Sequence, residues 1–179
     1  MFLKGQDIIA SLQLLLGVGP RWTYAELARK LGLSVGGANM AVRRARDAGL
    51  LMADPDGGDK PVARRQAILA FLEHGVATAF HTSPGGIVRG LPTAHSAPPL
   101  LGTIQTPPSE LPLVWPDAEG TVRGRSVEPL YRSAPGIARR DPEMYELLAL
   151  VDAVRCGAAR ERALAVEHLR QRLLHAPAK

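Results

Sequence analysis

Cysteine is almost missing from this sequence of 179 residues. The single cysteine, Cys156, excludes an internal disulfide framework and fits the reducing cytoplasm. No apolar run reaches the roughly 18 residues that a membrane span needs. Polar residues interrupt the opening stretch MFLKGQDIIASLQLLLG, and no small-residue cleavage site follows it, which favours an amphipathic helix over a signal peptide. We therefore expect a cytoplasmic protein that does not enter a membrane.

Patterns typical of catalytic or cofactor sites are also missing. The five histidines have no metal-ligand spacing with one another or with Cys156. The chain contains neither a P-loop nor the glycine fingerprint of dinucleotide-binding folds. His95 and Ser96 are neighbours in the sequence, and such side chains rarely face each other; nothing suggests a carboxylate that orients them. The sequence predicts no catalytic residue, no metal, no cofactor and hence no enzyme.

Positive charge is unevenly spread along the chain. The net charge is +5, and residues 1–65 hold ten Lys/Arg against six Asp/Glu, a surplus of four. Residues 66–179 hold twelve against eleven. The positive field therefore lies on the first third of the chain, as expected if that part meets phosphates.

The clearest pattern is a pair of helices joined by a tight turn. Thr23 and Glu26 form a capping box at the start of the first helix. Gly32 can end that helix in a left-handed conformation. Ser34 then caps a second helix over 35–48.

The two faces of this second helix differ in character. The inner positions are small and apolar: Val35, Ala38, Ala41, Val42 and Ala45. The outer positions are polar or cationic: Gly36, Asn39, Met40, Arg43 and Arg44. Such a helix packs on a neighbour and enters a DNA major groove, although a helical hairpin with solvated arginines gives the same pattern. Two glycines, Gly36 and Gly37, cost roughly 1 kcal/mol each relative to alanine, which indicates close approach either to DNA or to another helix.

The stretch TYAELARKLGLSVGGANMAVRRARDAGLL resembles the helix-turn-helix of MarR-like winged-helix regulators. The resemblance implies a sequence-specific, double-stranded-DNA-binding transcriptional regulator that acts as a repressor. Degenerate units of this kind that contact only proteins are the alternative. The expected DNA-binding residues are Thr23, Lys30, Ser34, Gly36, Gly37, Asn39, Met40, Arg43, Arg44, Lys60 and Arg64. We expect Arg43 nearer the bases and Arg44 nearer phosphate, with further phosphate contacts from Arg21 or Lys30.

A first helix over 5–16 and a wing complete the expected winged-helix domain. The wing has strands at 50–52 and 60–65, joined by the turn 54–59. Unlike the wings of the relatives, this turn carries three aspartates, and the basic residues follow it. We therefore expect the turn to stay off the DNA, or to be held away from it by Lys60 and Arg64.

The middle of the chain shows little periodicity. A helix is expected over 66–74 and a short strand over 76–80. The segment 81–136 is rich in proline and glycine, and its apolar residues favour an irregular, partly β layer over a flexible linker. Within it, 111–115 and 121–123 would flank a hairpin.

Regular structure returns at Asp141, an N-cap followed by a proline at the first helical position. Two helices follow, and their apolar stripes, which include Leu169, are expected to form a homodimer or to serve the chain's own core.

The expected fold is mostly α with small β, an α+β class. A winged helix-turn-helix domain would span 1–65, and a C-terminal α+β dimerisation or partner-binding domain would span 66–179. The two-part plan is also similar to the antitoxins of abortive-infection nucleotidyltransferase systems. Under that alternative the chain represses its own operon and holds a toxin protein through 81–179.

Overall fold

The computed structural model describes residues 2–19, 22–104, 107 and 109–175. Helices dominate it and the strands are short, so the predicted α+β class is confirmed. The first part contains α1 (Gly5–Leu16), α2 (Tyr24–Leu31), α3 (Val35–Asp47), β1 (Leu51–Met52) and β2 (Val62–Ala63). The rest contains α4 (Arg65–His74), α5 (Val76–Ala79), β3 (Ile87–Pro92), η1 (Ala94–Ser96), β4 (Leu113–Pro116), β5 (Val122–Ser126), α6 (Ala134–Arg140), α7 (Pro142–Cys156) and α8 (Ala159–His175). No helix in the described ranges is long and apolar enough to cross a membrane.

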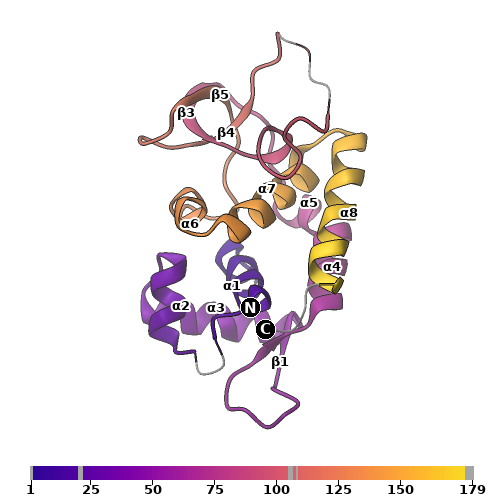
Figure 1. Ribbon diagram of the computed structural model, residues 1–179. Coiled ribbons are helices and arrows are strands. Elements are labelled where there is room, and N and C mark those ends of the chain that lie inside the picture. Colours follow the sequence, from indigo (N-terminus) through magenta and orange to yellow (C-terminus); the bar gives the residue numbers. More distant parts are fainter. Residues whose placement is uncertain (1, 20–21, 105–106, 108, 176–179) are drawn as a thin grey trace.

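Helix α7 lies at the centre of the molecule, with α1, α4, α5, α6, α8 and η1 packed around it (Figure 1). Asp141 caps it by accepting a hydrogen bond from Met144 N at 3.0 Å, as the sequence predicts. From Leu147 to Arg155 every residue is buried. Buried apolar side chains of α1–α3 and of the C-terminal helices belong to one continuous hydrophobic core.

The first part has the expected three helices and wing. Helix α1 spans the predicted residues 5–16, and it packs against α3 on one side and α7 on another. β1 and β2 pair antiparallel, with Leu51 opposite Ala63 and Met52 opposite Val62. Figure 1 shows the wing loop between them at the opposite end of the molecule from β3–β5.

Strands β3, β4 and β5 close into a very small barrel. β3 pairs antiparallel with both β4 and β5, and β4 and β5 pair with each other in parallel. The predicted hairpin between 111–115 and 121–123 is therefore wrong, because β3 is the antiparallel partner of both segments. Three glycines permit the close approach of the strands, because a Cβ at Gly90, Gly120 or Gly124 would overlap backbone atoms of a neighbouring segment.

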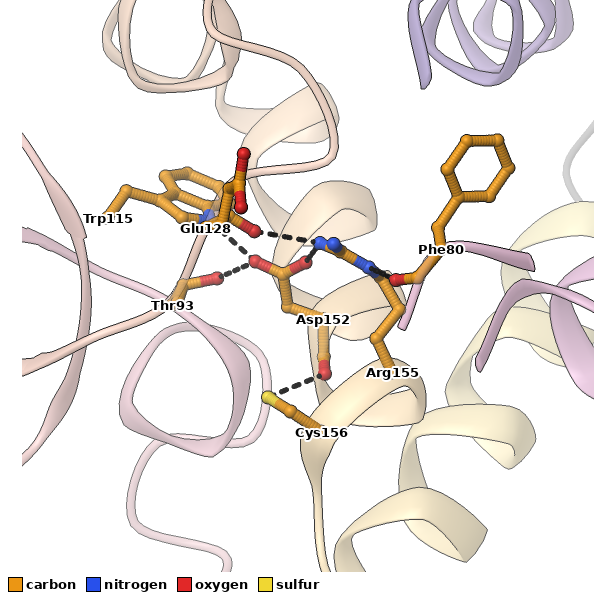
Figure 2. A network of polar contacts seen from close by, with 7 residues as sticks. All are labelled: Phe80, Thr93, Trp115, Glu128, Asp152, Arg155 and Cys156. Atoms are coloured by element: carbon orange, nitrogen blue, oxygen red, sulfur yellow. Dashed lines mark hydrogen bonds and ion pairs between the residues drawn. The ribbon is translucent and has the colours of Figure 1, made fainter. Parts of the chain in front are cut away.

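A buried polar network holds the barrel on α7 (Figure 2). The carboxylate of Asp152 accepts hydrogen bonds from Thr93 Oγ1 at 2.8 Å, from Trp115 Nε1 and from Arg155 Nη1 at 2.6 Å. Arg155 also donates to the carbonyl of Phe80 at 2.8 Å. Burial raises the pKa of Asp152, and Arg155 with the two neutral donors opposes that rise. The network joins η1, β4 and α7 through groups that are satisfied only when all three are in place.

One further prediction for the C-terminal part is wrong, and of the two roles expected for the apolar stripe of α8 the structure shows packing in the chain's own core. Residues 76–79 form the short helix α5 instead of a strand, because Gly75 keeps a right-handed helical conformation and its carbonyl accepts a hydrogen bond from Ala79 N. The apolar stripe of α8 faces α4 and α7 within the same chain, and Leu169 is completely buried there. That stripe is consequently not free to form a dimer interface.

Candidate nucleic-acid interface

Hydrogen bonds between residues close in the sequence determine where the two helices of the helix-turn-helix begin and end. Thr23 N donates to Glu26 Oε2 at 2.8 Å, and Glu26 N donates to Thr23 Oγ1 at 3.2 Å, which is the predicted capping box. Gly32 ends α2 with φ of +64°, a conformation that glycine adopts without strain. Ser34 Oγ accepts from Gly37 N at 3.0 Å and caps α3. Thr23 and Ser34 remain exposed at the ends of these helices, where the prediction places them as DNA contacts.

The inner face of α3 is buried from its second turn onward. The buried apolar residues are Ala38, Ala41, Val42 and Ala45. Val35 was expected on this face, but it is 53% exposed, because the packing of α3 on its neighbours begins only at Ala38. Small side chains on the buried face bring the backbone of α3 close to α1 and α2.

Arg44 points inward, so its predicted position on the outer face is wrong. Arg44 Nε donates to Asp7 Oδ2 at 2.8 Å, and Arg44 Nη2 donates to Asp7 Oδ1 at 2.6 Å. Arg44 is 7% exposed and Asp7 is fully buried. The hydrogen bond to Asp7 raises the pKa of Arg44, which keeps this guanidinium charged. A guanidinium held in this way is removed from the set of DNA contacts.

The outer face of α3 borders a shallow hollow of about 150 Å³ that also touches the wing. Asn39, Arg43 and Arg46 enter it from α3, and Tyr24 lines it from α2. Both arginines are exposed, and Met40 lies exposed on the same helix. Arg46 was missed from the sequence, although its position three residues after Arg43 places it on the same helix face. Guanidinium and amide groups beside an open hollow are the groups that read base edges and bind phosphates.

The two glycines in the first turn of α3 differ in their surroundings. A Cβ at Gly36 would meet no atom within 4 Å, whereas a Cβ at Gly37 would lie 3.1 Å from Ser34 Oγ. Tight packing within the chain therefore does not account for Gly36. Close approach of DNA at Gly36 stays a prediction.

Two basic residues predicted to touch DNA are engaged within the domain. Lys60 Nζ lies 5.1 Å from the ring centroid of Tyr24 and 6.0 Å from that of Trp22, in cation–π geometry. Arg64 Nη1 donates to the carbonyl of Gly49 at 3.1 Å. Lys60 thereby holds the end of the wing loop against the start of α2, and Arg64 ties the end of β2 to the end of α3. Each side chain still has part of its surface exposed.

The acidic wing turn is not wholly separate from α3. Asp59 lines the same hollow as Arg43 and Arg46, and its Oδ2 lies 3.4 Å from Lys60 Nζ, one of the two residues expected to hold the turn away from DNA. Asp54 Oδ1 accepts from Asp56 N at 3.0 Å, which fixes the turn itself. The hollow consequently combines two cations with one carboxylate.

Lys30 lies at the end of α2, where α6 approaches it. Its carbonyl accepts a hydrogen bond from Arg140 Nη2 at 3.4 Å, and its side chain is half-buried. Helix α6 thus adds a second cation beside α2 that the sequence did not indicate. Arg21, the other expected phosphate contact at this helix, lies outside the described residues.

Possible metal ligands do not converge in the described ranges, and the Ser–His contact that does occur there, Ser83 Oγ to His81 Nε2 at 3.2 Å, is exposed. In the part of the chain that the structure describes, no group of three or more His, Cys, Asp or Glu residues is placed to hold a metal. His95 Nδ1 lies 3.2 Å from Glu161 Oε2, and His95 borders a pocket of about 210 Å³ formed with the loop before β4. Ser96 Oγ accepts from Leu113 N at 2.9 Å instead of facing His95. His95 and Ser96 do not form a nucleophile–base arrangement.

Comparison with known proteins agrees with this geometry for the first part of the chain. No curated protein and no solved structure matches the sequence significantly. Residues 8–52 match the family described as winged helix-turn-helix DNA-binding, and the match covers most of α1, then α2, α3 and β1. Residues 8–52 therefore form a winged helix-turn-helix DNA-binding domain.

Proposed function

We propose that this protein is a transcriptional repressor that recognises a specific sequence in double-stranded DNA through the outer face of α3. The observation that carries the proposal is the arrangement of Asn39, Arg43 and Arg46 around one hollow, on a helix whose other face is buried. Inserted into a major groove, Asn39 and Arg43 present the amide and guanidinium groups that bind adenine and guanine edges. Arg46, one turn further along, would contact phosphate.

Repression follows from occupancy of the DNA. A folded chain that covers a promoter with α3 and a wing excludes other proteins from it, and no catalytic step is needed. A single helix-turn-helix buries little surface, so we propose that two copies read two half-sites about one helical turn apart. The dimer contact then lies on a surface other than the buried stripe of α8.

The same proposal assigns a separate role to each of the two parts of the chain. Residues 1–65 would bind DNA and residues 66–179 would hold a second copy or another protein. The antitoxin alternative, with a nucleotidyltransferase-type toxin held by 81–179, is tested by co-expression with such an enzyme encoded beside it and co-purification of the two.

Selection of bound sequences from random duplex DNA, followed by affinity measurements on the selected duplex, tests the main proposal. Arg43→Ala should weaken binding by about 5- to 150-fold and relax the preference at one base position, which corresponds to about 1–3 kcal/mol. Arg46→Ala should weaken all sequences alike and lower the slope of log K against log[salt] by about 0.9. Arg160→Ala, which removes an exposed arginine at the start of α8, is the matched control. Unchanged affinity and salt dependence in both α3 variants would remove α3 as the reading helix.

A further inference from the structure

The solvent-facing side of the small barrel carries an unusual set of side chains. We call it the arginine face, defined by Ile87 and Arg89 of β3 and Arg123 and Arg125 of β5. In the antiparallel register Ile87 lies opposite Arg125, and Arg89 lies opposite Arg123, so all four project from the same surface. The three arginines are exposed, and Ile87 is 56% exposed.

Barrel geometry forces these arginines outward. The interior has room for Val114 but not for a side chain at Gly90 or Gly124, where a Cβ would lie 3.0 Å and 2.9 Å from Val114 atoms. Successive residues of a strand point to opposite faces. Since Gly124 points inward, its neighbours Arg123 and Arg125 must point outward. Two arginines directly opposite one another, Arg89 and Arg123, repel each other in the isolated chain.

These cations are not neutralised within the described part of the chain. The side chains of Arg89 and Arg123 have no ion pair or hydrogen bond there, and Arg125 donates only to the carbonyl of Pro84 at 2.9 Å. The nearby carboxylates of Asp117 and Glu119 are paired with Arg139. Of the other arginines of this half, four have carboxylate partners and four have none among the described residues; the paired ones are Arg139, Arg155, Arg170 and Arg172, and the unpaired ones are Arg132, Arg140, Arg160 and Arg162. The arginine face is therefore a cluster of three cations that have no carboxylate partner among the described residues.

The side chains of the arginine face indicate which kind of negatively charged partner fits it. A protein interface has an apolar core of several residues, and here Ile87 is the single large apolar side chain among the four. Single-stranded nucleic acid is bound by stacking of bases on aromatic rings, and the four side chains of the face include none. Exposed guanidinium groups spaced along paired strands suit the phosphates of a duplex, which they bind in bidentate fashion.

We propose that the arginine face is a second, sequence-independent binding site for the phosphate backbone of double-stranded DNA. Figure 1 places the barrel and the wing at opposite ends of the molecule. Under this proposal the arginine face takes a segment of DNA other than the one bound at α3. One chain then bridges two stretches of DNA, one read by sequence at α3 and one held by charge at the barrel.

The first test is independent of sequence reading by α3. In a full-length background that carries Arg43→Ala and Arg46→Ala, the affinity for a random-sequence duplex is measured as salt is varied. Adding Arg89→Ala and Arg123→Ala should lower the slope of log K against log[salt] by about 0.9 for each phosphate that the face no longer binds. Adding Arg160→Ala and Arg162→Ala instead removes two positive charges from α8. This pair should lower the slope less than Arg89→Ala and Arg123→Ala do. Equal effects of the two pairs, or no effect, would overturn the proposal.

The second test measures bridging and rests on the proposed function. An immobilised duplex of the selected sequence binds the chain, and capture of a fluorescent random-sequence duplex is recorded. The wild type should capture the second duplex, and Arg89→Ala with Arg123→Ala should lose that capture while still binding the first. Wild-type capture by this variant would overturn the proposal. Loss of polyglutamate binding without loss of duplex binding would assign the face to an acidic protein instead. Thermal denaturation checks that each variant folds.

Discussion

The guanidinium of Arg44, in α3, binds both carboxylate oxygens of Asp7, in α1, inside the core. Asp7 Oδ2 also accepts a hydrogen bond from Lys4 N at 2.8 Å. Helix α1 packs on α7 as well, and the carbonyl of Leu130 lies against Gly5. The orientation of α3 is thus tied through one buried pair to the helix on which the C-terminal part rests.

Breaking this pair should destabilise the whole chain. Asp7→Asn leaves a buried guanidinium without its counter-charge, and we expect a loss of about 3–5 kcal/mol in the free energy of unfolding. Urea denaturation measures it. Asp47→Asn, which removes the same charge from an exposed position on α3, is the control and should change stability by about 0.5 kcal/mol or less. Similar stabilities for the two variants would contradict a structural role for the pair.

Alanine at Gly36 should separate stability from binding. Its Cβ meets no neighbour, and alanine favours the helix, so the free energy of unfolding should stay equal or rise by up to about 1 kcal/mol. DNA affinity should fall, because the added methyl group lies where the duplex approaches. Calorimetry and fluorescence anisotropy on the same variant measure both. Gly37→Ala, which crowds the Ser34 cap, should be the less stable of the two. Unchanged DNA affinity of Gly36→Ala would argue against close approach at this turn.

Neutralising Asp59 should strengthen DNA binding. Asp59 lines the hollow with Arg43 and Arg46, and its carboxylate, 3.4 Å from Lys60 Nζ, would repel a phosphate bound there. We expect Asp59→Asn to raise affinity a few fold at low salt, with a smaller gain at high salt because screening already weakens the repulsion. Asp56→Asn, at the exposed tip of the turn, should change affinity less. A large loss on changing Asp59 would mean that its carboxylate accepts a hydrogen bond from a base.

Truncation of Leu169 should affect folding and not association. The side chain is fully buried between α8 and the rest of the chain, so Leu169→Ala should cost about 2–5 kcal/mol of stability. Leu174→Ala, at a position that is 42% exposed, should cost much less. Denaturation and sedimentation of both variants separate a core role from a dimer role. A folded Leu169→Ala chain that merely dissociates to monomer would show that α8 forms the dimer contact after all.

Local sequence determined the helix-turn-helix almost completely. The bonds that start α2 and α3 join residues three positions apart, and Gly32 supplies the left-handed end between the helices. Partners this close in the sequence appear together in any short window, so their residue types suffice to predict the element. The same holds for Asp141 at the start of α7.

Tertiary structure alone decided where several side chains point. Arg44 lies at the flank of the predicted outer face, and its inward direction depends on Asp7, 37 residues away. The pairing of β3 with both β4 and β5 depends on interior glycines that look like loop residues in the sequence. The sequence of α8 does not indicate whether its apolar stripe packs on α4 or on a second copy of the chain. Helical periodicity states that a face needs burial, but the partner that covers it is chosen by packing between segments that are distant in the chain.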